Sequence, residues 1–371
     1  MTGSGSASDP FIIYDVTDLQ NMKDNLAAFY ELANDIDASA TSGWNAGLGF
    51  APVGSLATKF TGQLNGKGHT INALFINRTT DYNGLFGVID TPAVIKNVGL
   101  TAVNITGDSN TAALVGYETG PTTISNNYST GAIVGTSGGG SNTANGIGGL
   151  IGENQGDTSS ISKCYSTCTV SGARQVGGLI GRSRCTVTNS YARGAVTSSN
   201  TSNGLGLETG GFIGEINGSV ENCYSTGAVS SPGFGSPTQI GGFCGRILAP
   251  GTTTNCFWDT QTSGQAADGL DGTATGKTTA QMKTKSTFTD ATWDFDTIWA
   301  ILASVNDGYP YLSSSTLHHY LHVGGLHLPY EDLDETKELH MVLKNLSSST
   351  KAAHPDPDGA VVVEIEYVPA A

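Results

Sequence analysis

The chain has 371 residues, of which 38% are hydrophobic, only 13% are charged and 51 are glycine. This composition is typical of a turn-rich all-β protein and excludes an intrinsically disordered chain. The formal net charge of −15 makes nucleic acid a poor partner, because affinity for phosphates comes from Lys and Arg. No stretch approaches the roughly 18 apolar residues of a membrane helix, and the first residues lack the pattern of a Sec signal peptide.

The N-terminal segment predicts a polar arm followed by a cap. Phe11–Tyr14 reads as a strand, and Thr17 is expected to cap a helix that runs to about Leu26. Gln20 stands at the reciprocal position of a capping box. We interpret 1–58 as an arm and cap that cover the first rung of a repeat structure, because an open backbone edge would recruit other chains.

A four-residue glycine phrase then returns six times. Its copies end at glycines 29 to 36 residues apart: Gly87, Gly116, Gly152, Gly181, Gly214 and Gly245. Each copy is too short to bury its own apolar face, so the copies must stack. Three short strand-like segments per copy, with no helix signal between them, predict an all-β, right-handed parallel β-helix over residues 59–264. Glycine-rich insertions at 135–146 and 197–206 are expected to be loops that leave single rungs.

Stacking puts equal positions of successive rungs about 4.8 Å apart, so the phrases predict ladders of side chains. An asparagine ladder is expected at a turn: Asn97, Asn126, Asn189, Asn222 and Asn255, with Lys163 as the exception. An aromatic ladder follows: Tyr128, Tyr165, Tyr191, Tyr224 and Phe257. A third ladder is expected to point inward: Val98, Asn127, Cys164, Ser190, Cys223 and Cys256.

A fourth ladder carries charges that alternate from rung to rung. It comprises Tyr117, Glu153, Arg182, Glu215 and Arg246. We expect exposed ion pairs here, each contributing about 0.2–1 kcal/mol, whose main effect is to fix the register of the rungs.

The last part of the chain predicts a second cap and a separate module. In residues 265–312, Thr278–Met282 reads as a short helix. Four large apolar residues are suited to plugging the last rung: Trp293, Phe295, Trp299 and Ile301. Residues 313–371 predict a small β-sandwich-like module for attachment or oligomerisation, completed by a partner because its own core is marginal. Its strand candidates are Leu317–Val323, Leu326–Tyr330, Leu339–Leu346 and Ala360–Val368.

The glycine phrase, the phrase NCYSTGAV (Asn222–Val229) and the ending WDTQTSG…GKTTAQMK…WDF…YPYL resemble the GLUG-motif repeats of bacterial surface proteins, adhesins and some phage structural proteins. The resemblance covers about residues 11–312. It implies an extracellular β-helical scaffold, often adhesive, and it implies no catalytic residues.

Candidate metal ligands have a simpler interpretation. Four histidines cluster in sequence, His318, His319, His322 and His327, but a strand would present only two of them together. We favour packing or interface histidines over a metal on a trimer axis. Asp268 and Asp271 match no calcium loop and favour a plain turn. The sequence therefore predicts neither a metal site nor a cofactor.

Four glutamates are the acid–base candidates of a glycan-degrading β-helix, but no pair stands out among Glu153, Glu208, Glu215 and Glu221. No HExxH, GxSxG or Walker sequence is present, so we predict that the chain is not an enzyme. The six cysteines all lie in the repeats, and free thiols are favoured. A Cys223–Cys256 or a Cys168–Cys185 disulfide stays open.

These patterns predict a structural and adhesive protein, a β-helical rod on a surface. The absence of a signal peptide favours a phage virion component such as a head decoration, fibre or spike, with a secreted bacterial cell-surface adhesin as the alternative. A polysaccharide-degrading enzyme is the third hypothesis. The expected partners are a virion or cell-surface scaffold, a glycan or host receptor, and further copies of the chain in a homo-oligomer such as a trimer, without insertion into a membrane.

Overall fold

The computed structural model describes residues 1–136, 146–199, 208–231, 239–313, 319–323 and 326–330. The chain divides into two compact units, Met1–Leu312 and Ser313–Ala371, which are described separately. Most of the two glycine-rich insertions lies outside the described residues.

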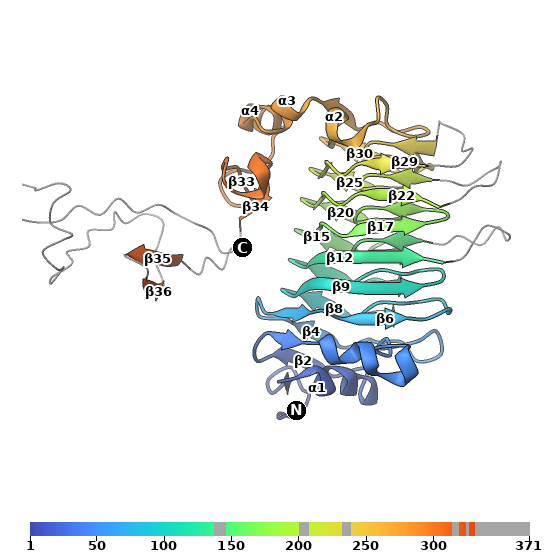
Figure 1. Ribbon diagram of the computed structural model, residues 1–371, viewed down its shortest axis with the longest axis vertical. Helices are drawn as coiled ribbons and strands as arrows, with labels where there is room; N and C mark the ends of the chain where they lie inside the picture. Colours follow the sequence, from blue (N-terminus) through green and yellow to red (C-terminus); the bar gives the residue numbers. More distant parts are fainter. Residues whose placement is uncertain (137–145, 200–207, 232–238, 314–318, 324–325, 331–371) are drawn as a thin grey trace, which may run out of the picture. The chain divides into compact units, whose positions relative to one another are not determined.

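The first unit is a stack of parallel strands (Figure 1). One sheet contains nine strands, each paired in parallel with its equivalent in the next rung. In spatial order they are β1 (Phe11–Ile13), β2 (Phe29–Leu32), β4 (Gln63–Asn65), β8 (Val94–Lys96), β11 (Thr123–Ser125), β15 (Ser160–Ser162), β20 (Thr186–Thr188), β25 (Ser219–Glu221) and β30 (Thr252–Thr254). Parallel pairing thus begins with β1 and β2, inside the segment expected to be arm and cap.

The glycine phrases lead into the strands of a six-stranded sheet, and in the later rungs an additional short strand directly precedes the phrase. The six strands are β7 (Phe86–Ile89), β10 (Val115–Glu118), β14 (Ile151–Asn154), β19 (Ile180–Ser183), β24 (Ile213–Ile216) and β29 (Cys244–Ile247). Beside them runs a four-stranded sheet of β13 (Ile147–Gly148), β18 (Val176–Gly177), β23 (Thr209–Gly210) and β28 (Ile240–Gly241).

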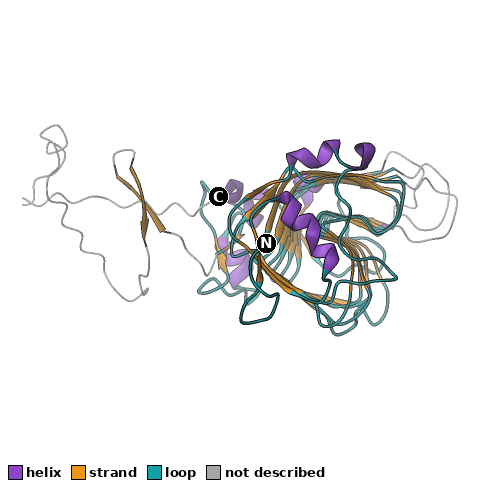
Figure 2. Cartoon of the chain, turned by 90° about the horizontal axis from the view of Figure 1, so that it is seen from below, coloured by secondary structure: helices purple, strands orange, loops and turns teal. Residues whose placement is uncertain are grey.

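The remaining side of the stack is a thirteen-stranded sheet. Its N-terminal strands are β3 (Ile36–Asp37), β5 (Thr70–Asn72), β6 (Phe75–Asn77), β9 (Gly99–Gly107) and β12 (Tyr128–Gly135). The later rungs add β16 (Tyr165–Ser166), β17 (Thr169–Gly172), β21 (Tyr191–Ala192), β22 (Val196–Ser198), β26 (Tyr224–Ser225), β27 (Val229–Ser230), β31 (Phe257–Asp259) and β32 (Thr275–Lys277). Figure 2, seen from below, shows the strands of successive rungs superimposed around a common interior. The predicted parallel β-helix is confirmed.

Glycines in and directly before the repeated phrase allow close packing of backbones. A Cβ on Gly177 would lie 1.9 Å from the carbonyl oxygen of Ile180, and a Cβ on Gly181 would lie 2.4 Å from the amide nitrogen of Ile147. Strands β18 and β19 therefore pack with no room for side chains between their backbones. Any other residue at these positions would force the chain apart.

The predicted ladders are present. The asparagine ladder and Lys163 all have a positive φ between 47° and 58°, a region that Asn tolerates better than most residues. At the N-terminal end of this ladder the amides bond along the axis, where Asn126 Nδ2 donates to Asn97 Oδ1 over 3.2 Å. The first four rings of the aromatic ladder stack 4.7–5.0 Å apart and within 7° of parallel. The third ladder points inward, and all six cysteines are buried free thiols.

The first helix differs from its prediction. Helix α1 (Val16–Asn21) is capped by Asp15, whose Oδ1 accepts the backbone N–H groups of Thr17 and Asp18 over 2.8 and 2.9 Å. The expected cap by Thr17 is therefore wrong, because Asp15 is the residue that directly precedes the helix. The helix ends well before Leu26. A 3₁₀ turn (Met22–Asp24) follows it, and two more occupy Ser39–Gly43 and Asn45–Gly47.

The segment 278–312, which we call the C-terminal lobe, packs against the side of the stack instead of plugging its end. It contains α3 (Thr279–Met282), α4 (Lys285–Thr289), a 3₁₀ turn (Asn306–Gly308) and an antiparallel pair, β33 (Trp299–Ala300) with β34 (Tyr311–Leu312). Trp299 lies against Tyr191 and Tyr224, with ring centroids 6.2 and 6.0 Å apart. The large apolar side chains of the lobe therefore cover the C-terminal half of the aromatic ladder.

Residues 265–277 close the last rung in place of the lobe. After α2 (Thr260–Ser263), the carbonyl of Ala267 accepts the N–H of Gly242, and Leu270 donates to the carbonyl of Gly245. Strand β32 then pairs in parallel with β31. The stack thus ends in one partial rung.

In the second unit, β35 (His319–Val323) and β36 (Leu326–Tyr330) pair antiparallel, with His322 opposite His327. They agree with two of the four expected strands. The other two, Leu339–Leu346 and Ala360–Val368, lie outside the described residues, as does His318.

Candidate binding site

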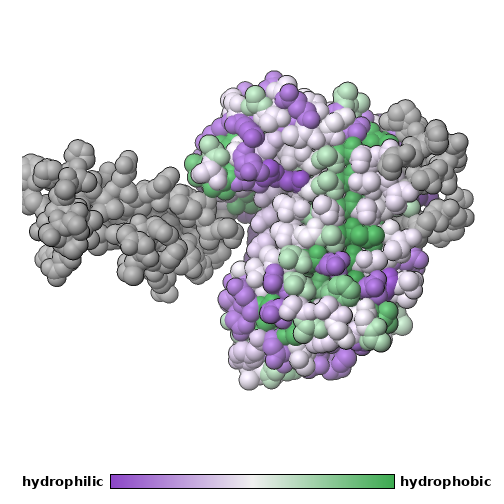
Figure 3. Space-filling model, viewed as in Figure 1, coloured by the Kyte–Doolittle hydropathy of each residue, from purple (hydrophilic) through white to green (hydrophobic). Residues whose placement is uncertain are grey.

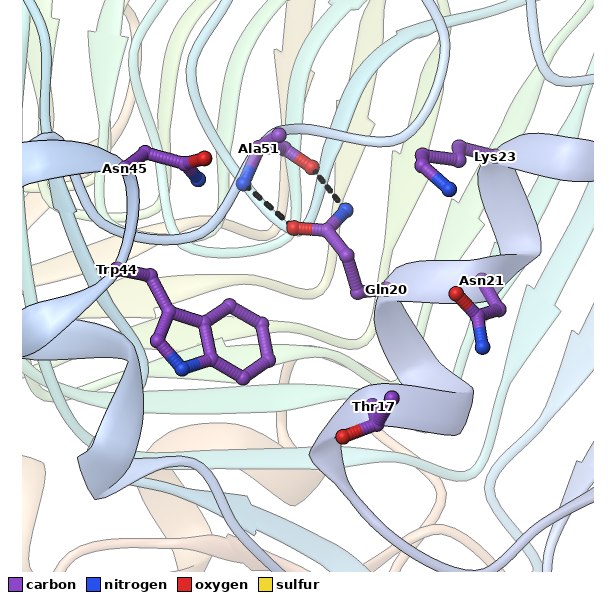
Figure 4. Close-up of a pocket in the computed structure, with 7 residues that line it drawn as sticks. All are labelled: Thr17, Gln20, Asn21, Lys23, Trp44, Asn45 and Ala51. Carbon is purple, nitrogen blue, oxygen red and sulfur yellow. Dashed lines mark hydrogen bonds between the residues drawn. The ribbon is translucent and has the colours of Figure 1, made fainter.

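A shallow pocket of about 430 Å³ opens between α1 and the loop that follows Thr41 (Figure 4). Its volume lies within the roughly 300–1,000 Å³ typical of ligand sites. The residues that line it are Thr17, Gln20, Asn21, Lys23, Trp44, Asn45 and Ala51.

The walls of this pocket are tied together by hydrogen bonds. The Gln20 amide binds the backbone of Ala51 twice, donating to its carbonyl over 2.8 Å and accepting its N–H over 2.9 Å. On the opposite wall, Asn45 Nδ2 donates to the carbonyl of Gly49 over 2.7 Å. Asn45 and Ala46 have φ values of 52° and 57°, a left-handed backbone that non-glycine residues seldom adopt. The loop is therefore held in one conformation.

The two walls differ in chemistry. Trp44 is half-buried and packs against the core. Helix α1 faces it with polar groups, and neither the Thr17 hydroxyl nor the Asn21 side chain makes a hydrogen bond within the described part of the chain. Lys23 pairs with exposed Asp24 over 3.0 Å. Sequence reasoning missed this pocket, because a lone Trp44 in a glycine-rich loop has no repeat to mark it.

The charged ladder runs across the six-stranded sheet in the predicted register: Glu153 beside Arg182, Arg182 beside Glu215, and Glu215 beside Arg246. Arg182 lies 3.2 Å from a carboxylate oxygen of Glu153 and 2.8 Å from one of Glu215. The expectation of exposed pairs is wrong, since Glu153 is only 5% and Glu215 only 3% exposed. These ion pairs belong to the interior, where removing one partner is costly.

Glu208, another of the acid–base candidates, lies beside this ladder. It is 1% exposed, and Arg174 Nε donates to its carboxylate over 3.1 Å. Burial raises the pKa of Glu208, and Arg174 opposes that rise. Glu221, the fourth acid candidate, is exposed on β25 and lies outside this group. The structure thus brings three of the four glutamates together, and each lies in the interior beside an arginine.

Glu118 is a buried carboxyl that sequence reasoning did not single out. It is completely buried beside the charged ladder, where Asn154 Nδ2 and Ser159 Oγ donate to its oxygens. Burial raises its pKa to about 7, although these donors pull it down. No arginine pairs with it among the described residues, which sets it apart from Glu153 and Glu215.

Of the candidate metal ligands, Asp268 has a structural role, and His318 lies outside the described residues. Asp268 Oδ1 accepts the N–H of Cys244 over 2.8 Å, and Oδ2 accepts the N–H of Ala274 over 3.1 Å. This carboxylate closes the last rung of the stack. The described residues contain no group of three or more His, Cys, Asp or Glu placed to hold a metal ion.

The surface shows one further feature. Hydrophobic atoms form a stripe across the rungs on the face of the thirteen-stranded sheet (Figure 3). Val134, on β12, is 37% exposed. Within the described residues, no helix is long and apolar enough to span a bilayer.

Comparisons with known proteins agree with the repeat. A family model of the GLUG motif matches residues 143–171 and 172–197. Halomucin of Haloquadratum walsbyi is 42% identical over 129 residues, which are 32% of this chain and 1% of halomucin. A candidate Gly-rich membrane protein of Evansella cellulosilytica is 32% identical over 406 aligned positions, covering 83% of this chain and 45% of the relative. The chain therefore spans less than half the length of either relative.

A solved structure supports the fold alone. The crystal structure of a candidate immunoglobulin A1 protease from Bacteroides ovatus superimposes with a TM-score of 0.63 at 20% identity, over 84% of this chain and 94% of that one. Two matched motifs thus lie among the six stacked copies of the glycine phrase, and the chain carries GLUG-motif repeats within a parallel β-helix.

Proposed function

We propose that this GLUG-repeat protein is a non-enzymatic, adhesive scaffold exposed on a cell surface, where it presents a glycan-binding face. The observation that carries the proposal is that the buried glutamates are already engaged with arginines. Glu153, Glu208 and Glu215 are at most 5% exposed, and each lies beside an arginine. A glycosidase needs two carboxyl groups that flank the substrate, and these three lie inside the fold.

The relatives support the location. The Evansella relative is named as a membrane protein, and the repeat phrases of this chain resemble those of surface proteins and adhesins. The relatives described above come from cellular organisms, so we take the cell-surface alternative over the virion component. Protease treatment of intact producing cells tests this: the chain should be cleaved while a cytoplasmic marker stays intact.

We assign attachment or oligomerisation to residues 313–371, because they form a compact unit apart from the rod. Deleting them should leave a folded rod that no longer attaches to the cell or assembles. Light scattering and cell fractionation on the full chain and on 1–312 measure both effects. Full attachment of the truncated chain would refute this division of roles.

Activity assays test the non-enzymatic half of the proposal. We expect no release of reducing ends from bacterial polysaccharides and, in view of the structural neighbour, no cleavage of immunoglobulin A1. Release of sugar that is lost in Glu208→Gln, in a preparation shown by circular dichroism to be folded, would overturn the scaffold assignment.

A further inference from the structure

We propose that the pocket between α1 and Trp44 binds a single pyranose unit of a glycan, with the sugar ring packed on the indole. The inference deepens the proposed function and rests on it, because it names the site and the ligand class of the adhesive face.

The exposure of Trp44 is the first argument. The other three tryptophans, Trp258, Trp293 and Trp299, are 1–5% exposed, so this chain buries its indoles where it can. Trp44 alone stays half-buried, with its inner side packed on the core and part of the ring open to the pocket. An aromatic ring fixed in this way offers an apolar surface to the C–H groups of a sugar ring.

The polar rim is the second argument. Sugar hydroxyls need both donors and acceptors, and the Thr17 hydroxyl and the Asn21 amide supply both. Neither group is used by another described residue. The amide of Gln20, by contrast, is fully engaged with Ala51 and forms part of the frame.

The charge of the rim selects among sugars. Lys23 is the one ionic residue that lines the pocket, in a chain whose formal net charge is −15. Its ammonium lies at the exposed edge, beside Asp24. A carboxylated pyranose should therefore bind more tightly than its neutral counterpart, and added salt should reduce that difference.

Preorganisation is the third argument. The bond from the Asn45 side chain to the Gly49 carbonyl holds the loop, although Asn45 is left-handed, and the Gln20 amide fixes its distance from α1. Strained backbone of this kind is concentrated at binding sites. In addition, a wall that is already ordered loses little entropy when a ligand arrives.

The test measures tryptophan fluorescence of the full chain. Trp44 contributes the part of the signal that acrylamide can quench, because the other three indoles are buried. A panel of methyl glucoside, methyl galactoside, methyl mannoside and methyl glucuronide is titrated to about 10 mM, well into the range of weak single-site binding. We expect at least one member to protect the accessible indole from acrylamide quenching. Methyl glucuronide should bind more tightly than methyl glucoside.

Three variants locate the effect. Trp44→Ala should abolish binding in a calorimetric titration. Asn21→Ala, which removes a side chain without a hydrogen bond among the described residues, should weaken binding at least threefold. Tyr14→Ala is the matched control, since Tyr14 is an aromatic residue 48% exposed near the same end of the chain and does not line the pocket. It should bind like the parent chain. Circular dichroism confirms that Trp44→Ala is folded.

The outcomes separate the site from the function. If the panel binds equally well to Trp44→Ala and Asn21→Ala, the pocket is not the site, while the glycan-binding function stands. If no panel member protects the indole but a glycan array binds the full chain, the pyranose assignment fails on its own. If neither the panel nor the array binds, both this inference and the glycan-binding part of the proposed function are refuted.

Discussion

The aromatic ladder and the charged ladder use the same geometry with opposite rules. The aromatic ladder repeats one kind of side chain, and its tyrosine rings lie 4.7–5.0 Å apart. The charged ladder never repeats itself from Glu153 onward, because like charges at such a separation repel whereas opposite charges attract. Neutral rings can therefore extend a stack without limit, while charges specify which rung lies next to which.

The two ladders also differ in what depends on them. In the charged ladder the glutamates are buried, whereas Arg182 and Arg246 are only partly buried. The aromatic ladder offers a side face, on which the C-terminal lobe docks around Tyr224 and Trp299. One ladder sets the register and the other carries an appendage, and each of the following predictions separates these roles.

The largest expected effect follows from Arg182→Met. The change leaves the carboxylates of Glu153 and Glu215 buried without their shared cation. Losing one partner of a buried ion pair costs about 3–5 kcal/mol, and urea denaturation should show a loss of that size in the free energy of unfolding.

A rescue shows whether charge is the cause. Adding Glu153→Gln and Glu215→Gln to Arg182→Met should recover most of the loss. Arg184→Met serves as the matched control, because Arg184 makes no ion pair within the described residues; its effect should stay below about 1 kcal/mol. An equal loss in both arginine variants would show that packing, rather than the alternating charge, stabilises this ladder.

Glu118, which lies beside the charged ladder without an arginine partner among the described residues, makes stability depend on pH. Burial raises the folded-state pKa of Glu118 to about 7, above its ordinary value of 4.5. The folded protein thus binds this proton more tightly than the unfolded chain. Stability from this group is complete below about pH 4.5 and is lost as the pH rises to 7, by about 3 kcal/mol in all.

Glu118→Gln should remove that dependence. Between pH 5 and pH 8, the parent chain should lose about 2.5 kcal/mol more than the variant in urea denaturation. Asp90 and Cys185 interact electrostatically with Glu118 and are present in both chains, so the difference between the two pH profiles is the quantity to compare. Parallel pH profiles would mean that Glu118 is ionised in the folded protein.

The ladders were predictable because they follow from counting along repeated phrases. Their burial was not, since the exposure of Glu153 depends on segments from other rungs, such as the loop whose Asn110 donates to its carboxylate over 2.7 Å. The position of Trp299 on the side of the stack could not be predicted for a related reason. A segment rich in large apolar residues must bury them, but its sequence does not specify which surface it covers. The Trp44 pocket joins two non-repeating segments, for which the chain offers no internal comparison.

The docked lobe provides the third prediction, with Tyr224→Phe. The Tyr224 hydroxyl donates to the carbonyl of Pro310 and accepts from Asn306 Nδ2 over 2.8 Å. Because both partners are in the lobe, its loss should cost about 1–2 kcal/mol and speed hydrogen exchange of 299–312. Tyr165→Phe is the matched control, because its hydroxyl makes no hydrogen bond within the described residues and its removal should leave exchange in the lobe unchanged.

The smallest effect concerns the turn beside the aromatic ladder, where Lys163 replaces the expected asparagine at φ 52°. Lys163→Asn should stabilise the protein by about 0.5–1 kcal/mol, since Asn tolerates the left-handed region and can join the amides that bond along the axis. Lys163→Gly relieves the backbone but supplies no amide, so thermal denaturation of the two variants separates the contributions. If Gly stabilises as much as Asn, the asparagine ladder exists for its backbone conformation, and the amide bonds between rungs add nothing. If Asn exceeds Gly, neutral side chains at the turn contribute cohesion between rungs in the same way as the stacked tyrosines.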